Sequence, residues 1–135
     1  MRLDSQVNAW EIAARAPDCH PFQVGAQVLL DGGDKDDFIV ALLHDSIEDG
    51  YASKRELAES FGQDIADAVW ELTRTEGEIY SEYIDRIAVS APSVRRVKLA
   101  DVYVNLQRSQ RSGEKSRVKR YQRAFNRIAD NAYGL

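Results

Sequence analysis

The sequence predicts an all-α fold, a single domain of six to eight helices that spans residues 1–135. Apolar residues recur at the three- and four-residue spacing of amphipathic helices along most of the chain. Strict alternation of apolar and polar residues, which marks a half-buried strand, never continues for long. Proline, glycine and capping residues stand where the helical patterns stop, and no internal repeat or linker divides the chain.

Proline and glycine delimit the first two helices. The segment 4–16 carries apolar residues at helical spacing and stops before Pro17, because the residue that precedes a proline disfavours helical backbone. Pro21 fits the first turn of the second helix, which the run Asp31-Gly32-Gly33 ends. The spacing of Trp10 within the first helix predicts that its ring packs in the core.

The third helix is apolar on nearly every side. Its residues 38–43 read Phe-Ile-Val-Ala-Leu-Leu, which indicates a central, buried helix. Asp36 or Asp37 is expected to cap its first turn, because a short carboxylate accepts hydrogen bonds from free backbone amides there. We expect the helix to continue through residues 44–49.

Caps and periodicity predict the remaining helices. Ser53 and Glu56 match a capping box, in which a hydroxyl and a carboxylate three residues apart satisfy free amides at a helix start. Gly62 interrupts the pattern that follows, and Trp70 falls at a spacing compatible with the core. These helices are expected at residues 54–61, 64–73, 80–89, 92–106 and 114–129.

The composition is typical of a soluble globular protein, with 44% apolar and 30% charged residues. No apolar run approaches the roughly 18 residues that span a bilayer, which excludes a membrane helix. The single cysteine, Cys19, excludes an internal disulfide and fits a reducing compartment. Because the first residues also lack an apolar signal segment, we expect a cytoplasmic location.

Charge is distributed unevenly along the chain, although the net charge is only −4. Residues 1–85 hold 19 acidic and 6 basic side chains, whereas residues 86–127 hold 12 basic and 2 acidic ones. An acidic half folded against a basic half suits a site that holds a cation together with a polyphosphate. Nucleic-acid binding is the alternative for the basic stretch, but the overall acidity and the lack of interleaved aromatic residues disfavour it.

Four polar side chains of ligand type follow the apolar run 41–43. On a helix, His44 and Glu48 would share one stripe, and Asp45 and Asp49 the stripe beside it. Burying so many carboxylates costs several kcal/mol each unless a cation or hydrogen bonds compensate. Imidazole with carboxylate suits Zn, Mn or Fe, so a metal site is the first hypothesis. The alternative is a solvated helix end with a hydrogen-bonded His-Asp pair.

Further ligand candidates lie far away in the sequence. His20, the only other histidine, precedes Pro21 at a helix start. Asp101 and Asn105 stand four residues apart within an apolar helix, so their side chains face the same direction. Taken alone, this Asp/Asn pair favours a local hydrogen-bond network at a helix end.

The order His…His-Asp…Asp, formed here by His20, His44-Asp45 and Asp101, resembles the pattern of HD-domain phosphohydrolases. The closer resemblance is to the hydrolase domain of RelA/SpoT-type (p)ppGpp hydrolases and their small single-domain relatives. It rests on His20-Pro21, Ala41-Leu42-Leu43-His44-Asp45-Ser46-Ile47-Glu48-Asp49, Phe61-Gly62, Leu72-Thr73, Lys98-Leu99-Ala100-Asp101 and Asn105-Leu106.

The resemblance implies a complete hydrolytic site. A divalent metal ion, usually Mn²⁺, would be bound by His20, His44, Asp45 and Asp101. Glu48 and Asp49 would be the catalytic carboxylates, and Asn105 would contact the nucleotide. The segment 80–86 is similar to one in small HD hydrolases, which makes Arg86 a candidate phosphate contact, with Lys98 a further candidate.

The chain departs from the (p)ppGpp hydrolases just before His20. In those hydrolases, this stretch carries basic residues and a turn that help to hold the purine. Here it is replaced by residues 14–19, in which Arg15 is the only cation. We therefore expect metal-dependent hydrolysis of a nucleotide phosphoester, most specifically removal of the 3′-pyrophosphate of guanosine-3′,5′-bis(diphosphate). The alternatives are an HD-type phosphatase acting on deoxynucleoside monophosphates or NADPH, and a non-catalytic nucleotide-binding regulatory module.

Overall fold

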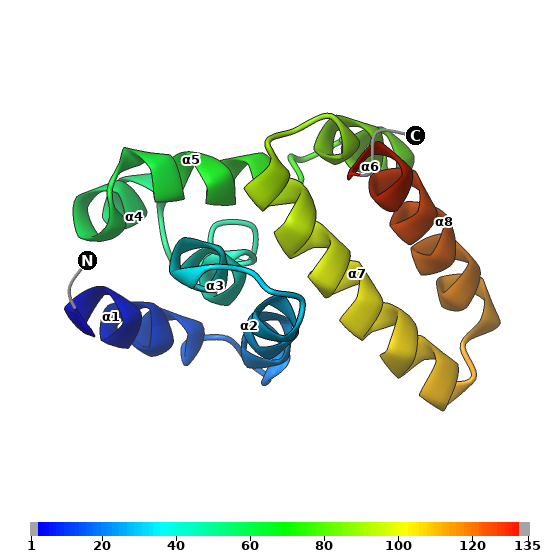
Figure 1. Cartoon of the computed structure of the whole chain (residues 1–135), viewed down its shortest axis with the longest axis horizontal. Coiled ribbons are helices and arrows are strands. Elements are labelled where there is room, and N and C mark those ends of the chain that lie inside the picture. The colour runs from blue at the N-terminus through cyan, green and yellow to red at the C-terminus, as the bar shows by residue number, and fades with distance from the viewer. Residues whose placement is uncertain (1–2, 133–135) are drawn as a thin grey trace.

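The computed structural model describes residues 3–132, and this part of the chain contains eight α-helices and no strand. The helices are α1 (Leu3–Ala13), α2 (His20–Leu30), α3 (Lys35–Leu43), α4 (Lys54–Phe61), α5 (Gln63–Leu72), α6 (Tyr80–Ala88), α7 (Pro92–Ser112) and α8 (Lys115–Ala132). The predicted all-α fold is confirmed. In Figure 1, α7 separates α1 to α5 from α6 and α8.

The apolar helix α3 is central, as its sequence predicts. It packs against α1, α2, α5 and α7, and residues 39–43 are fully or almost fully buried. The long helix α7 contacts α2, α3, α5, α6 and α8 and so joins the two sides of the molecule. A polar residue on the inner face of α7 is therefore held against both α2 and α3.

Several helix starts agree with the sequence. Pro21 and Pro92 both lie in the first turn of their helices, α2 and α7, where a missing N–H costs no hydrogen bond. The hydroxyl of Ser53 accepts a hydrogen bond from the amide of Glu56 at 3.0 Å, which caps α4. Only this half of the predicted capping box forms, because the Glu56 carboxylate pairs with Arg15 instead.

The expected cap of α3 is wrong by two or three residues. Asp34, whose backbone is extended, caps the helix. Its Oδ1 accepts a hydrogen bond from the backbone amide of Asp37 at 2.8 Å. The Asp37 carboxylate returns a hydrogen bond to the amide of Asp34 at 3.1 Å, so a reciprocal capping box forms. Asp37 is almost fully buried and pairs with Arg96, which ties the start of α3 to α7.

The expected continuation of α3 through residues 44–49 is also wrong, because the helix ends at Leu43 and residues 44–50 form consecutive turns. The amide of Ser46 donates to the carbonyl of Leu43, three residues earlier, at 2.9 Å. This bond closes a tighter turn than the four-residue bond of an α-helix. Gly50 has a φ of +79°, which turns the chain away. The carbonyl of Ser46 then accepts a hydrogen bond from the amide of Tyr51, so Asp45, Glu48 and Asp49 lie in turns and not in a helix.

The two tryptophans are half exposed, which corrects the expectation that they pack in the core. Trp10 lies against Phe22 with ring centroids 4.6 Å apart, and the ammonium of Lys54 lies 5.5 Å from the centroid of Trp70. Each ring thus covers a neighbour at the surface instead of filling the interior. None of the described helices combines the length and apolar composition needed to cross a bilayer.

Candidate metal centre

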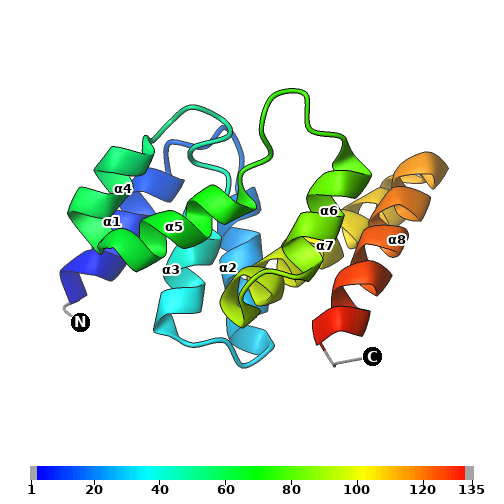
Figure 2. The same cartoon turned by 90° about the horizontal axis from the view of Figure 1, so that it is seen from above.

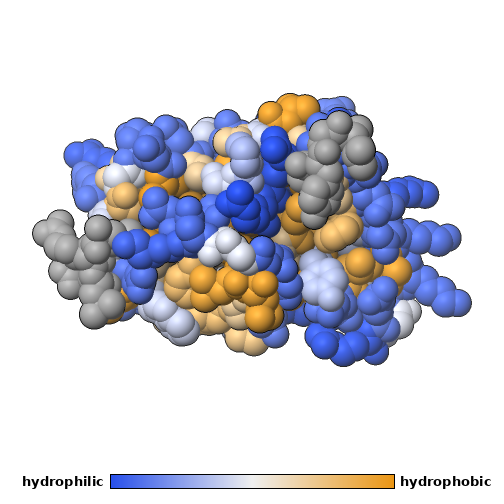
Figure 3. All heavy atoms as spheres, viewed as in Figure 1, coloured by the Kyte–Doolittle hydropathy of each residue, from blue (hydrophilic) through white to orange (hydrophobic). Residues whose placement is uncertain are grey.

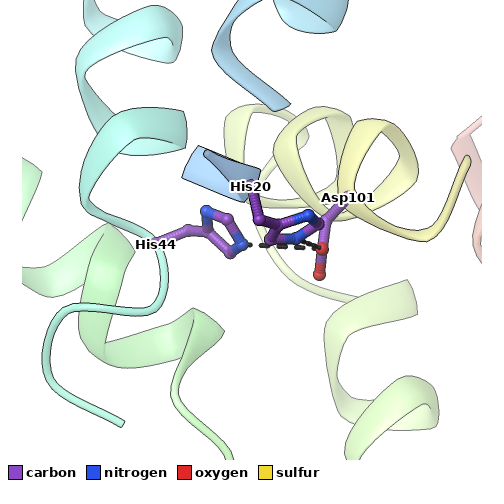
Figure 4. A group of neighbouring side chains, drawn as sticks. All are labelled: His20, His44 and Asp101. Atoms are coloured by element: carbon purple, nitrogen blue, oxygen red, sulfur yellow. Dashed lines mark hydrogen bonds and ion pairs between the residues drawn. The ribbon is translucent and has the colours of Figure 1, made fainter. Parts of the chain in front are cut away.

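Asp101 lies at the centre of a buried polar cluster on the inner face of α7. Its Oδ1 is 2.7 Å from Nε2 of His20 and 3.5 Å from Nε2 of His44. Its Oδ2 accepts a hydrogen bond from the ammonium of Lys98 at 2.7 Å. Figure 4 shows the carboxylate and both imidazoles, from α7, the start of α2 and the end of α3, pointing toward one another.

The ring of His44 is oriented by the last turn of α3. Its Nδ1 lies 2.6 Å from the carbonyl of Ala41, and because a carbonyl can only accept, Nδ1 carries the proton. A neutral ring then directs the Nε2 lone pair at the carboxylates of Asp101 and of Asp45, whose Oδ2 is 3.1 Å away. Nε2 is buried and makes no hydrogen bond of normal geometry among the described residues.

His20 is held by the backbone at the start of α2. Its amide donates to the carboxylate of Asp18 at 3.0 Å, which fixes the first residue of the helix. The rings of His20 and His44 meet edge to face, with centroids 5.4 Å apart and planes at 63°. Both imidazoles therefore reach Asp101 from separate elements.

The electrostatic balance of the cluster favours positive charge next to Asp101. Burial alone would lower the pKa of His44, but the carboxylates of Asp45 and Asp101 outweigh it and hold that pKa well above its ordinary value. Burial would likewise raise the pKa of Asp101, yet Lys98 and the two histidines hold it well below its usual range. The negative charge that favours a proton on Nε2 of His44 equally favours a metal ion.

This donor set fits a divalent metal ion. His20, His44 and Asp101 each offer a ligand atom within 4.8 Å of the other two, and all three residues are buried. A backbone carbonyl that orients a histidine through its second nitrogen, as at His44, is the usual support of a metal ligand. Asp45 is half-buried beside His44 but outside this cluster of three, so its role as fourth ligand stays a prediction.

A hollow of about 260 Å³ opens beside the cluster. Its lining includes His20, Asp45, Glu48, Asp49, Lys98, Asp101 and Asn105, together with Pro17, Asp18, Tyr51, Tyr80, Tyr121 and others. Eight of the nine residues predicted for the site thus lie together: seven line the hollow, and His44 lies against two of them, Asp45 and Asp101. Figure 2 shows the connections after α1, α3 and α5 on the same side of the molecule.

Glu48 and Asp49 are placed for acid and base chemistry. Burial raises the pKa of Glu48, although the amide of Arg74, which donates to its Oε1 at 2.7 Å, opposes the rise. Burial and the neighbouring charge of Asp45 raise the pKa of Asp49. A carboxyl group with a raised pKa accepts a proton more readily near neutral pH.

The side chains with predicted substrate contacts, Asn105 and Arg86 as well as Lys98, have partners within the protein. The side-chain amide of Asn105 donates a hydrogen bond through Nδ2 to Oδ1 of Asp101 at 3.2 Å, as the four-residue spacing predicts. Arg86 does not line the hollow. Its guanidinium donates to the carbonyls of Glu71 and Thr73 and to both carboxylate oxygens of Glu78.

Sequence reasoning missed the aromatic wall of the hollow. Tyr51, Tyr80 and Tyr121 come from three different segments, and no local pattern distinguishes them from core tyrosines. The stretch before His20 contributes no cation to the lining. Arg15 turns away and donates to the carbonyl of Tyr51 at 2.9 Å and to Glu56.

No protein-family model matches the chain, and no curated protein sequence matches it significantly. Among solved structures, a metazoan ortholog of SpoT, described as hydrolysing ppGpp and playing a role in starvation responses, has a similar fold. The TM-score is 0.70 at 27% sequence identity, over 85% of this chain and 70% of that one. The chain therefore has a helical fold of the HD-domain type and resembles a (p)ppGpp hydrolase.

Proposed function

We propose that the protein is a metal-dependent phosphohydrolase that acts on a phosphoester of a nucleotide. One observation carries this proposal: a buried His-His-Asp cluster shares a hollow with two carboxylates whose pKa values are raised. The similarity to a hydrolase structure supports it, because it covers most of the chain.

His20, His44 and Asp101 would hold the metal ion, with Asp45 as the fourth ligand, and Mn²⁺ is the proposed ion. When bound, a divalent ion lowers the pKa of a coordinated water and polarises a phosphoryl oxygen. Glu48 would take the proton of the attacking water. The amide of Arg74 holds Oε1 of Glu48, and Glu48 lines the hollow.

Neighbouring side chains complete the proposed site. Asp49 would share the proton transfer with Glu48, because the two carboxylates line the same hollow. The buried ammonium of Lys98 would balance negative charge on the substrate phosphate while it holds Asp101. Asn105 would contact the nucleotide from the same wall. Arg86 stays a predicted phosphate contact, and it would reach a phosphate only by releasing Glu78.

The most specific substrate that we propose is a guanosine-3′,5′-bis(diphosphate)-like nucleotide, from which the 3′-pyrophosphate is removed. A second candidate is a phosphatase acting on deoxynucleoside monophosphates or NADPH. The position of Arg15 favours this alternative, because the only cation of residues 14–19 binds Tyr51 and Glu56 instead of facing the hollow.

A nucleotide panel tests the proposal. The purified protein with Mn²⁺ is incubated with ppGpp, deoxynucleoside monophosphates and NADPH, and released phosphate and pyrophosphate are measured. We expect one class to be hydrolysed, with kcat about 100-fold lower in Glu48→Gln because the general base is lost. Glu82→Gln, on the exposed face of α6, is the matched control and should retain activity. No release from any nucleotide, or equal rates in both variants, would contradict the proposal.

A further inference from the structure

A second hollow lies on a different face of α7 from the candidate metal centre. It measures about 580 Å³, a volume that accommodates a small molecule. Its lining comes from α2, α7 and α8 and includes Gln27, Pro92, Arg95, Leu99, Tyr103 and Phe125. Among the described residues, none lines both this hollow and the one beside the metal cluster. The second hollow therefore has no part in the proposed reaction.

Arg95 carries a positive charge that no carboxylate within residues 3–132 neutralises through an ion pair. Its Nη1 donates a hydrogen bond to the carbonyl of Ser90 at 2.5 Å, which holds the side chain beside the start of α7. Its Nε is buried and has no hydrogen-bond partner among the described residues. A buried donor without an acceptor is unfavourable, so an acceptor supplied by a ligand would stabilise Arg95. The N-terminus of α7, which no side chain caps, adds partial positive charge nearby.

The other charged groups of the hollow have partners. Arg96 pairs with the buried carboxylate of Asp37. Oδ1 of Asp31, an exposed residue after α2, accepts a hydrogen bond from Nε2 of Gln27 at 2.9 Å. The two guanidinium groups are thus matched in number by two carboxylates, and only Arg95 lacks a direct partner. A ligand with one negative charge suits this balance better than a doubly charged phosphate.

The rest of the lining is mainly apolar and aromatic. Leu99 packs against the core, and the rings of Tyr103 and Phe125 lie with centroids 6.4 Å apart and planes at 49°. The hydroxyl of Tyr103 accepts a hydrogen bond from Nε2 of Gln107 at 3.0 Å. The tyrosine therefore offers its ring to a ligand, and an aromatic ring gains most from such contacts.

We propose that this hollow binds an aromatic compound that carries a single carboxylate group. Nε and Nη2 of Arg95 lie on the same edge of the planar guanidinium, and neither has a partner in the described part of the chain. They would donate two parallel hydrogen bonds to the carboxylate. The aromatic ring of the ligand would pack against Leu99, Tyr103 and Phe125.

Two ligands with the same ring separate the contribution of the charge from that of the ring. 1-Naphthoate carries a carboxylate, and 1-naphthamide is its uncharged analogue. Calorimetry measures the Kd of each ligand. We expect 1-naphthoate to bind about tenfold more tightly than 1-naphthamide, and Arg95→Gln to remove most of that preference. Phe125→Leu should weaken both ligands by a similar factor, because it removes a ring contact and leaves Arg95 in place.

The matched control is Arg108→Gln, because Arg108 is another arginine of α7 but lines the hollow beside the metal cluster. This variant should leave both Kd values unchanged. Equal affinity of wild type for the two ligands, or binding of neither, would overturn the inference. A preference that is lost in Arg108→Gln and retained in Arg95→Gln would also overturn it, since the carboxylate would then lie near the metal cluster.

Arg95→Lys covers the case in which Arg95→Gln does not fold, which circular dichroism detects. The lysine keeps the positive charge but not the pair of parallel donors, so we expect it to retain only part of the preference for 1-naphthoate. An unchanged preference in Arg95→Lys, together with unchanged binding in Phe125→Leu, would contradict the site. Failure of the proposed function is distinguishable, because absence of nucleotide hydrolysis would leave the binding of 1-naphthoate unaffected.

Discussion

Lys98 and Asp101 form the most deeply buried charged pair next to the candidate metal centre. Both side chains are almost inaccessible to solvent, and their charged atoms are 2.7 Å apart. Burial would lower the pKa of Lys98, but Asp101 outweighs it and raises that pKa well above its ordinary value. Each charge is therefore tolerated in the interior because the other is present.

Removing both partners should cost less than the sum of the two single removals. Asp101→Asn leaves the ammonium of Lys98 buried without a counter-charge, which should lower the free energy of unfolding by about 3 kcal/mol. The double variant with Lys98→Met should lose about 1 kcal/mol less than the sum of the two single changes. Urea unfolding in the presence of EDTA measures this coupling without a contribution from bound metal. Strict additivity would contradict the pairing.

At the residue scale, sequence motifs predicted much of the polar cluster. The pattern His20, His44 and Asp101 was recognisable, and the structure brings these three side chains together. The partners of Arg86 could not be predicted, because they are backbone carbonyls of another segment and a loop carboxylate. Contacts of that kind depend on how the chain folds back and leave no local pattern in the sequence.

The connection between α5 and α6 places the amide of Arg74 against Glu48, so its conformation matters for the site. Arg86 holds this connection through Glu78, whose Oε2 it meets at 2.9 Å, and through the carbonyl of Thr73. Hydrogen bonds from Arg86, together with the amide of Thr75, lower the pKa of Glu78 to about 2. The ion pair between Arg86 and Glu78 thus fixes the conformation of this connection.

The lowered pKa of Glu78 predicts a pH-dependent contribution to stability. The contribution is present above the ordinary value of 4.5 and is lost as the pH falls toward about 2, since the unfolded chain takes up the proton first. The difference in free energy of unfolding between wild type and Glu78→Gln should therefore shrink between pH 6 and pH 2. Urea titrations at each pH measure it, and Glu82→Gln tests whether any exposed carboxylate gives the same trend. A constant difference would contradict the role of the pair.

The turn from α7 to α8 depends on a left-handed glycine. Gly113 has φ +73° and ψ +21°, and no atom lies within 4 Å of the position of a Cβ. Gly113→Ala should therefore lower the free energy of unfolding by about 1 kcal/mol through backbone strain alone. Gly113→Asn should cost less, because asparagine tolerates this conformation better. Equal stability of the alanine variant and wild type in urea would contradict this account.

At the element scale, periodicity predicted where helices form better than where they end. The apolar run of α3 continues smoothly into His44, so local pattern favoured a longer helix. The structure ends α3 at Leu43 because the carbonyl of the buried Ser46 accepts the amides of Tyr51 and Ala52. These bonds satisfy the backbone in a turn, which competes with helix continuation.

For the whole molecule, the candidate metal centre depends on packing between segments far apart in sequence. His20 and Asp101 are 81 positions apart, and α7 brings them together by packing on α2 and α3. Figure 3 shows hydrophilic residues over the edge of the molecule where α8 lies in Figure 1. The basic C-terminal half thus supplies Lys98 and Arg108 to the hollow beside the cluster, whose acidic residues other than Asp101 come from the N-terminal half.

Because the ligands come from α2, α7 and the turn that follows α3, a bound metal ion should stabilise the folded chain as a whole. A ligand that binds only the folded state adds about 2.7 kcal/mol at 100 times its Kd. Wild type should therefore gain stability in urea when Mn²⁺ is added, whereas Asp101→Asn should gain much less. An equal gain of stability in both proteins would show that the ion binds at a site other than the one that includes Asp101.

Metal content tests the central claim most directly. The protein is dialysed to equilibrium with Mn²⁺, and bound metal is measured by elemental analysis in wild type, His44→Gln, Asp101→Asn and the exposed control Asp85→Asn. We predict about one Mn²⁺ per chain in wild type and in Asp85→Asn, and almost none in the other two, because each has lost a ligand. A wild-type protein that binds no metal, or equal metal in all four proteins, would contradict the assignment of His20, His44 and Asp101 as a metal centre.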